Sequence, residues 1–334
     1  MLRENLVRFF RAVTLASAAA TFALALAPAT RAQTPIVIKF SHVVTPDTPK
    51  GKGAERFKQL AEERTQGRVK VEIYPNSQLY KDKEEMEALQ LGSVQMLAPS
   101  LAKFGPLGVK DFEVFELPFI FKDTAAFRAV TEGPVGQGLL KKLEPKGIKG
   151  LAYWDNGFDI MSANTPLQHV ADFRGQKMRI QSSKVLDAQM RALGAIPQVM
   201  AFSELYQALQ SGVVDGTENT PSNFYTQKLH EVQKHITLSN HGHIAYAVPA
   251  DIRTMLEGAM KDASDYVNAI SETENAEALD KIRASGKASM YSLTPDELNE
   301  WRKALMPVHQ EMEARIGKET LEAVYQASGF VMPK

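Results

Sequence analysis

The chain has 334 residues, with 39 lysines and arginines against 39 aspartates and glutamates, 44% hydrophobic residues and no cysteine. This length and hydrophobic content suit about two ordinary domains with real cores and argue against disorder. Balanced charge with mixed signs lacks the basic surface typical of a nucleic-acid binder. The lack of cysteine excludes disulfides, cysteine-ligated zinc, iron–sulfur clusters and thiol nucleophiles.

The first 32 residues have the pattern of a secretory signal peptide. A basic start with Arg3, Arg8 and Arg11 leads into an apolar stretch over 13–27, and small residues follow up to Ala32. About fifteen apolar residues are too few for a spanning helix, which needs about twenty. We therefore expect cleavage after Ala32 and an exported, mildly acidic mature chain; the alternative is a retained membrane anchor.

Strands and helices alternate over the next seventy residues or so. The pattern predicts strands at 35–43, 69–75 and 93–99, and helices at 52–67 and 82–92. Glu84 and Glu85 are expected on the solvated face of the second helix. This alternation is typical of an α/β domain.

A similar unit recurs later in the chain. A predicted helix at 202–212 leads into a strand at 213–219, and ALQSGVV (208–214) matches ALQLGSV (88–94) in its helix end, glycine and strand entry. Between the two units, the Trp-Asp-Asn-Gly segment inside 146–164 is a candidate crossover. The sequence thus predicts two similarly built α/β lobes.

The last quarter of the chain is predicted to be mainly helical. Apolar residues recur at helical spacing over 250–285 without a proline, which predicts one very long helix or two consecutive ones. At about 1.5 Å per residue, one such helix could extend over both lobes. Residues 294–317 open with a Thr-Pro-Asp-Glu start signal and predict a further helix.

Catalytic and metal-binding patterns are missing from the sequence. There is no nucleophile elbow, no P-loop and no dinucleotide-binding glycine motif. His230 and His235 are five residues apart, one too many for a zinc-binding helix. His241 and His243 could share a strand face, but no third ligand accompanies them, so ordinary packing is the favoured interpretation. We predict no catalytic residues, no metal and no cofactor.

A ligand-recognition pattern remains. Arg179 follows a turn and lies on a predicted strand, where its planar guanidinium could anchor a carboxylate; a structural arginine is the equal alternative. Asn219 ends the second helix–strand unit and could hydrogen-bond a ligand or simply shape a turn. Candidate apolar walls, each also suited to plain core, are Trp154, Phe158, Phe202 and Phe224.

Long, ordered motifs across residues 35–330 give a specific resemblance. They include KFSHVVTPDTPKGKGAERFKQLAEERTQGRVKVEIYP, EMEALQLGSVQMLAPSLAKF, WDNGFDIMSANTPL, DFRGQKMRIQSS and MAFSELYQALQSGVVDGTENTPSNFY. The chain resembles the DctP family, the periplasmic solute-binding proteins of tripartite ATP-independent periplasmic (TRAP) transporters. This implies a two-lobed α/β periplasmic-binding-protein fold crossed by a long helix. It also implies a monomeric periplasmic protein that is not an enzyme, closes on an organic acid and delivers it to a membrane permease of one small and one large subunit.

The resemblance also implies site residues. Arg179 matches the family's carboxylate-clamping arginine and Asn219 its pocket asparagine. Ser41, His42 and Ser100 match stretches that face the cleft, with Lys103 a weaker cationic candidate. Asn156 and Phe158 lie at the crossover. Asn240 and His241 are possible lining residues.

Asp159 departs from the pattern, because many dicarboxylate-binding members have a lysine or arginine there. An anion would repel a second ligand carboxylate. Either His42 or Lys103 meets that carboxylate instead, or the ligand is a monocarboxylate whose hydroxyl, keto or aromatic part faces Asp159.

The expected organisation places lobe I at 33–156 and 245–284, lobe II at 157–244 and 285–334, and the ligand between them. A C4-dicarboxylate such as succinate, malate or fumarate is the favoured ligand. The alternatives are a 2-oxo, 2-hydroxy or aromatic monocarboxylate, a ligand-sensing role beside a membrane receptor, or an exported hydrolase.

Overall fold

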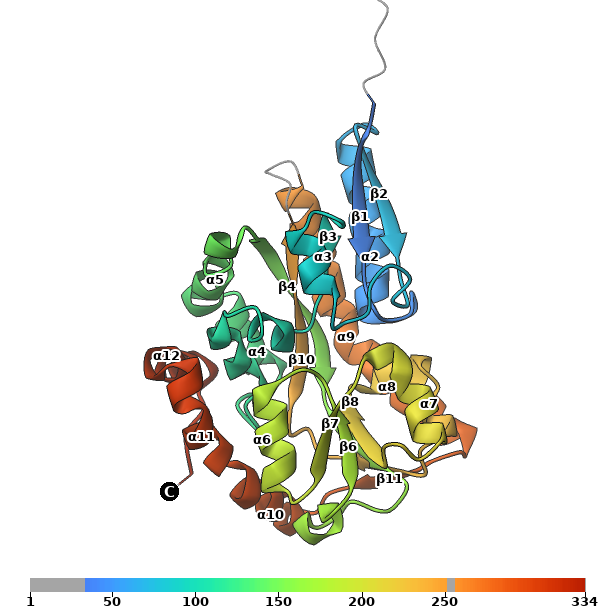
Figure 1. Cartoon of the computed structure of the whole chain (residues 1–334), viewed down its shortest axis with the longest axis vertical. Coiled ribbons are helices and arrows are strands. Elements are labelled where there is room, and N and C mark those ends of the chain that lie inside the picture. The colour runs from blue at the N-terminus through green and yellow to red at the C-terminus, as the bar shows by residue number, and fades with distance from the viewer. Residues whose placement is uncertain (1–33, 251–255, 334) are drawn as a thin grey trace, which may run out of the picture. The chain divides into compact units, whose positions relative to one another are not determined.

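Two separate mixed sheets organise the chain in the computed structural model (Figure 1), which describes residues 34–250 and 256–333. The predicted signal peptide at 1–32 lies outside the described residues. The two-lobed α/β fold class is confirmed, whereas the lobe boundaries given above stay a prediction. No described helix combines the length and apolar character needed to cross a bilayer.

The first sheet has the strand order β2-β1-β3-β10-β4. Strand β1 pairs in parallel with β2 and β3, and β10 is antiparallel to β3 and β4. The bounds are β1 Ile36–Ser41, β2 Val69–Tyr74, β3 Met96–Leu97, β4 Lys149–Phe158 and β10 His243–Ala250. Helices α2 (Pro49–Arg64) and α3 (Glu85–Gln90) follow β1 and β2, as the alternating pattern predicted.

The second sheet has the order β11-β9-β5-β8-β6-β7. The bounds are β5 Ile160–Ala163, β6 Lys177–Ile180, β7 Ile196–Val199, β8 Gly216–Asn219, β9 His235–Leu238 and β11 Ser289–Ser292. Only Asp159 separates β4 of the first sheet from β5 of the second, so the chain crosses between the sheets at the predicted segment. Helices α6 (Lys184–Ala192), α7 (Leu205–Gln210) and α8 (Pro221–Thr226) accompany this sheet.

The predicted internal similarity is confirmed at the backbone. Helices α3 and α7 have six residues each, and Gly92 and Gly212 follow them with φ of 71° and 72°. The next N–H in each case, of Ser93 and of Val213, donates to an alanine carbonyl at an N···O distance of 2.9 Å. Glycine adopts this left-handed conformation at little cost, which explains its place at both helix ends.

One uninterrupted helix, α9 (Glu257–Ser285), confirms the longer alternative for this region. It is about 43 Å long and packs against α2 and β4 on the side of the first sheet and against α8 on the side of the second. The Asn275 side chain accepts from the Ser222 N–H at 2.9 Å and donates to the Asn156 carbonyl at 2.7 Å. It thereby fastens α8 and β4 to one point of α9.

The C-terminal helix predicted over 294–317 is instead two helices. Pro307 has no N–H to donate to the preceding turn, so a new helix begins there. Thr294 and Glu297 form the capping box that the start signal indicated. The remaining helices are α4 Thr124–Thr131, α5 Pro134–Lys141, α10 Pro295–Leu305, α11 Pro307–Ile316 and α12 Lys318–Ser328.

Candidate ligand-binding site

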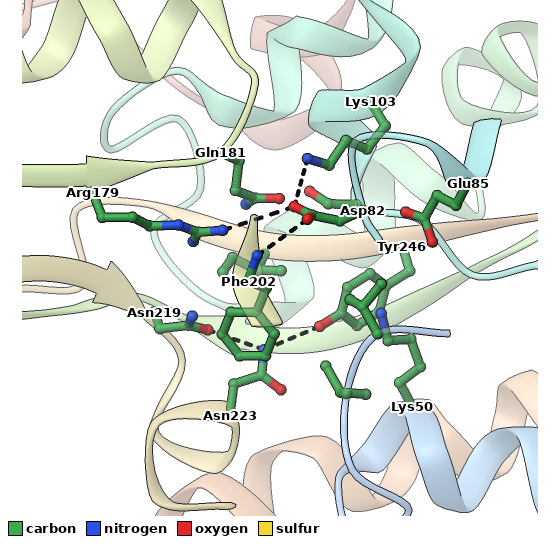
Figure 2. A pocket seen from close by; sticks show the side chains of 14 residues that line it. Lys50, Asp82, Glu85, Lys103, Arg179, Gln181, Phe202, Asn219, Asn223 and Tyr246 are labelled. Atoms are coloured by element: carbon green, nitrogen blue, oxygen red, sulfur yellow. Dashed lines mark hydrogen bonds and ion pairs between the residues drawn. The ribbon is translucent and has the colours of Figure 1, made fainter. Parts of the chain in front are cut away.

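A cavity enclosing about 390 Å³ of space not filled by protein atoms lies among elements of both sheets (Figure 2). Two groups of residues line it. The first comes from β1, β10 and the helices and loops near them: Val43, Val44, Lys50, Asp82, Glu85, Ser100, Lys103, Ile244 and Tyr246. The second comes from the stretch between β6 and α8: Arg179, Gln181, Phe202, Asn219 and Asn223. The sequence-predicted Arg179, Asn219 and Ser100 come together here, as do Lys103 and Phe202.

Arg179 presents to this cavity a buried guanidinium edge that lacks a hydrogen-bond partner in the described part of the chain. It lies on β6 with only 2% of its surface exposed, and its Nε donates to the Met200 carbonyl at 3.0 Å. Its Nη2 is buried and has no hydrogen-bond partner among the described residues. Burial lowers the pKa of Arg179 from its ordinary value, and yet an arginine stays charged in proteins. A planar anion such as a carboxylate would complete its hydrogen bonding.

A chain of amides adjoins the arginine. The Asn219 Oδ1 accepts from the Thr220 N–H and from Asn223 Nδ2, both at 3.0 Å. Asn223 Nδ2 also donates to the Tyr246 hydroxyl at 3.2 Å. Since Oδ1 of Asn219 is already used as an acceptor, its NH₂ group is the part left to serve a ligand oxygen.

Asp82 forms ion pairs with two of the cations that line the cavity. Its carboxylate accepts from Lys103 Nζ at 2.9 Å and from the Phe202 N–H at 3.1 Å, and lies 3.8 Å from Arg179 Nη2. Burial alone would raise the pKa of Asp82, but Lys103 and Arg179 hold it below the ordinary value. Asp82 is therefore ionised at neutral pH.

Residues 81–83 contact elements on the side of the second sheet, and we call these three consecutive residues the clasp. Lys81 pairs with Glu204 at 2.6 Å, Asp82 accepts from the Phe202 N–H, and Lys83 Nζ donates to the Val199 carbonyl at 3.3 Å. All three contacts join the segment before α3 to the end of β7 and the turn that follows it.

Lys50 and Glu85 face the cavity from the side opposite Arg179 (Figure 2). Lys50 Nζ donates to the Ala98 carbonyl at 3.0 Å and lies 3.8 Å from the centre of the Tyr246 ring. Glu85 is only 1% exposed, so the expectation that it lies on a solvated helix face is wrong. The exposed Glu84 fits that expectation.

Burial shifts both of these groups toward neutral pH. It raises the pKa of Glu85 to about 7, a shift that Lys50 opposes. It lowers the pKa of Lys50 to about 8, against the attraction of Glu85 and Asp82. Two ionisable groups of opposite sign therefore titrate near pH 7 on the wall of one cavity.

Besides Asp159, Asn240 and His241, which are described below, six predicted contacts lie outside this cavity. Trp154 packs in the core on Phe40 and donates its indole N–H to Ser264 at 2.8 Å, and Phe224 is also core. Phe158 packs edge-on against His243. The remaining three, all buried, are Ser41, His42 and Asn156. Asn156 donates to Thr220 at 2.6 Å, and burial together with Lys50 lowers the pKa of His42 to about 3.

Asp159 lies in a neighbouring group of buried acids, which we call the acid group: Glu116, Asp159 and Glu218 line a second, smaller cavity. Glu116 is hydrogen-bonded to Ser183, and Glu218 Oε2 lies 3.3 Å from His241 Nε2. Burial, Glu218 and Glu116 raise the pKa of Asp159 well above its ordinary value, which favours its neutral form. In that form Asp159 would not repel a second ligand carboxylate.

The two histidines considered for metal binding have other neighbours. His241 contacts Ser239 and Glu218, while His243 lies 3.2 Å from Asp155 and stacks on Phe127. Across residues 34–250 and 256–333, no three His, Asp or Glu side chains are grouped so that they could hold a metal ion. Asn240 lies in a groove with Phe119 and Phe330, away from the Arg179 cavity.

Sequence reasoning missed Lys50, Asp82, Glu85, Tyr246 and Asn223. For Lys50, Asp82 and Glu85, the only signal in the sequence was that their side chains are charged, and other charged residues in the same segments are solvated. Asn223 follows Asn219 by four residues, a spacing that places two side chains near each other in a helical turn and could have identified it.

Comparison with known proteins gives consistent relatives. Residues 40–316 match the model of the bacterial extracellular solute-binding proteins, family 7 (DctP). The C4-dicarboxylate-binding periplasmic protein DctP of Rhodobacter capsulatus is 65% identical over 304 residues, covering 88% of this chain and 91% of that protein.

Solved structures agree with this match. A TRAP periplasmic solute-binding protein from Shewanella oneidensis with bound succinate is 41% identical, with a TM-score of 0.86 over 88% of this chain and all of that one. Another, from Pseudomonas aeruginosa with bound L-malate, is 44% identical, with a TM-score of 0.80 over 83% of this chain and all of that one. This chain is therefore a member of the DctP family of bacterial extracellular solute-binding proteins.

Proposed function

We propose that this protein is the periplasmic solute-binding component of a TRAP transporter and captures a C4-dicarboxylate such as succinate, malate or fumarate. The observation that carries the proposal is the buried Nη2 of Arg179, which has no hydrogen-bond partner among the described residues and faces a cavity rich in further cations. The dicarboxylate names of the relatives support the same ligand class.

The proposed mechanism is closure on the ligand. Arg179 and Asn219 belong to elements of the second sheet, and Lys50 and Tyr246 to those of the first. A ligand held by both sets gains all its contacts only when the two sides are together, so it shifts the equilibrium toward the closed form. The loaded protein would then deliver the acid to a membrane permease of one small and one large subunit.

The test is calorimetry and thermal unfolding of the mature chain with succinate, malate, fumarate, butyrate, 2-oxobutyrate and galactonate. A ligand at a hundredfold excess over its Kd adds about 2.7 kcal/mol to the stability, which is visible as a raised Tm. We expect shifts with the three dicarboxylates. Tm shifts confined to monocarboxylates would show that the ligand is a monocarboxylate and not a dicarboxylate. A lack of any Tm shift would contradict the proposed binding site.

Location and partner need their own experiments. Fractionation of cells that carry the full-length gene should place the shortened chain, starting near Gln33, in the periplasm. Permease subunits reconstituted in vesicles should take up labelled succinate only with this protein present. Uptake at the same rate without it would contradict the transport role.

A further inference from the structure

The charges around the Arg179 cavity do not balance a dicarboxylate. Three cations line the cavity, Lys50, Lys103 and Arg179, against two carboxylates, Asp82 and Glu85. With all five ionised, the wall carries one net positive charge. A monocarboxylate cancels that charge, whereas a dicarboxylate leaves one negative charge buried and uncompensated, which is costly away from water.

One additional proton on the wall would restore neutrality. Arg179 stays protonated, and Asp82 is held ionised by Lys103 and Arg179. Lys50 and Glu85 remain. Their charged groups form no ion pair with each other, and the Glu85 carboxyl has no hydrogen-bond or ion-pair partner among the described residues. Such a carboxyl can accept a proton without breaking a contact.

We propose that a dicarboxylate binds with one carboxylate on Arg179 and the other against Lys50, and that the Lys50–Glu85 pair takes up one proton as it does so. This inference rests on the proposed function. In the empty site the pair is neutral as a whole, whichever member holds the shared proton. In the complex Lys50 is an ammonium, Glu85 is a neutral acid, and the second carboxylate takes the place of Glu85 as counter-ion.

The surroundings of the pair support this location. Lys50 donates one N–H to the Ala98 carbonyl and lies over the Tyr246 ring. An ammonium has three N–H donors, so others remain for a ligand oxygen. The charged groups that face Glu85 are Lys50 on α2, Lys103 on the turn after β3, and Asp82. His42, next to Lys50, stays neutral because burial lowers its pKa to about 3. Glu84 and Glu87, on the helix of Glu85 itself, are exposed.

The direction of the pH effect follows from linkage. The complex binds more protons than the empty protein, so affinity falls as pH rises above about 7, the value to which burial raises the pKa of Glu85. The slope approaches a tenfold loss of affinity per pH unit, one proton being exchanged per ligand. Below about pH 7 the slope flattens, because the pair is already protonated.

The experiment is titration calorimetry of the mature protein with succinate at pH 7.5 in phosphate, HEPES and Tris, whose ionisation enthalpies differ. We expect the observed enthalpy to change linearly with buffer enthalpy, with a slope that corresponds to uptake of between about half a proton and one proton. Butyrate, with one carboxylate, should give no slope. Binding of succinate with zero slope and no pH dependence would overturn the inference but leave the proposed function standing. No binding at all would contradict the proposed function.

Variants locate the proton. Lys50→Met/Glu85→Gln removes a pair of opposite buried charges together, a change that cores tolerate; we expect at least tenfold weaker succinate binding without proton uptake. Glu84→Gln, one residue away and exposed, should behave as the wild type. Proton uptake that persists in the double variant would show that the acid group takes up the proton. A protonated carboxyl in the carbon-13 spectrum of bound labelled succinate would show that the ligand holds it. Either result overturns the inference, and the labelled wild-type complex also serves if the double variant binds nothing.

Discussion

The surroundings shift the pKa of Asp82, in the Arg179 cavity, and those of Asp159 and Glu116, in the neighbouring acid group, in opposite directions overall. Asp82 in the Arg179 cavity has Lys103 and Arg179 within 4 Å and is held ionised. Asp159 and Glu116, in the acid group, have other carboxyls as neighbours, so burial raises the pKa of both and that of Glu116 to about 8. Asp82 thus stays ionised beside two cations, whereas Asp159 and Glu116, beside other carboxyls, are shifted toward their neutral forms, and the difference lies in the cations.

Removal of the anchor cation should have the largest effect. Arg179→Gln keeps a hydrogen-bonding side chain but leaves the ligand carboxylate without its counter-charge. We expect succinate binding to weaken by about 2–5 kcal/mol, the range for losing one side of a buried charge pair. Calorimetry measures the loss. Unchanged affinity would remove Arg179 from the anchor role.

Removal of the ionised carboxylate should destabilise the fold. Asp82→Asn leaves Lys103 buried without a counter-ion, and we expect a loss of about 3 kcal/mol from the free energy of unfolding. Urea denaturation at pH 7 without ligand measures it. A cost no larger than that of Asp159→Asn would show that the two clusters do not differ in charge.

The contributions of Glu116 and Asp82 to stability should depend on pH with opposite signs. Glu116 has its pKa raised to about 8 by burial, so the folded chain binds more protons there than the unfolded chain between about pH 4.5 and 8. Stability from Glu116 therefore falls as pH rises through this window, and Glu116→Gln should flatten that part of the curve. Asp82, whose pKa is lowered, loses its contribution only as pH falls below about 4. Denaturation curves at pH 3, 5, 6.5 and 8 measure both effects, with Glu84→Gln as the control.

The smallest effect is expected at Asp159. A neutral acid and an amide have similar size and polarity, so Asp159→Asn should change stability and succinate affinity by less than about 1 kcal/mol. Asp159→Lys would instead bury a cation beside Glu116 and Glu218. A large loss of dicarboxylate preference in Asp159→Asn would return Asp159 to the role of a ligand filter.

The fold followed from the sequence further than the site did. Helix and strand periodicity, the paired glycine caps and the proline-free run of α9 are local signals, and each was confirmed. Arg179 was found because it follows a turn onto a predicted strand, and Asn219 because it ends a helix–strand unit; the family resemblance pointed to both. Lys50, Asp82 and Glu85 owe their burial to partners far along the chain: Asp82 contacts Phe202, 120 residues later. A charged side chain in an amphipathic helix is ordinarily expected to face solvent, and only the tertiary arrangement shows that it is buried instead.

The clasp at residues 81–83 bears on the lifetime of a complex as well as on its affinity. Any separation of the two sides must break the contacts of Lys81, Asp82 and Lys83 with Glu204, Phe202 and Val199, with or without a ligand between them. Ligand exchange therefore waits on these contacts, so weakening them should speed both arrival and departure. The Lys81–Glu204 pair is about half exposed and screened by salt. Residence time should consequently shorten as ionic strength rises.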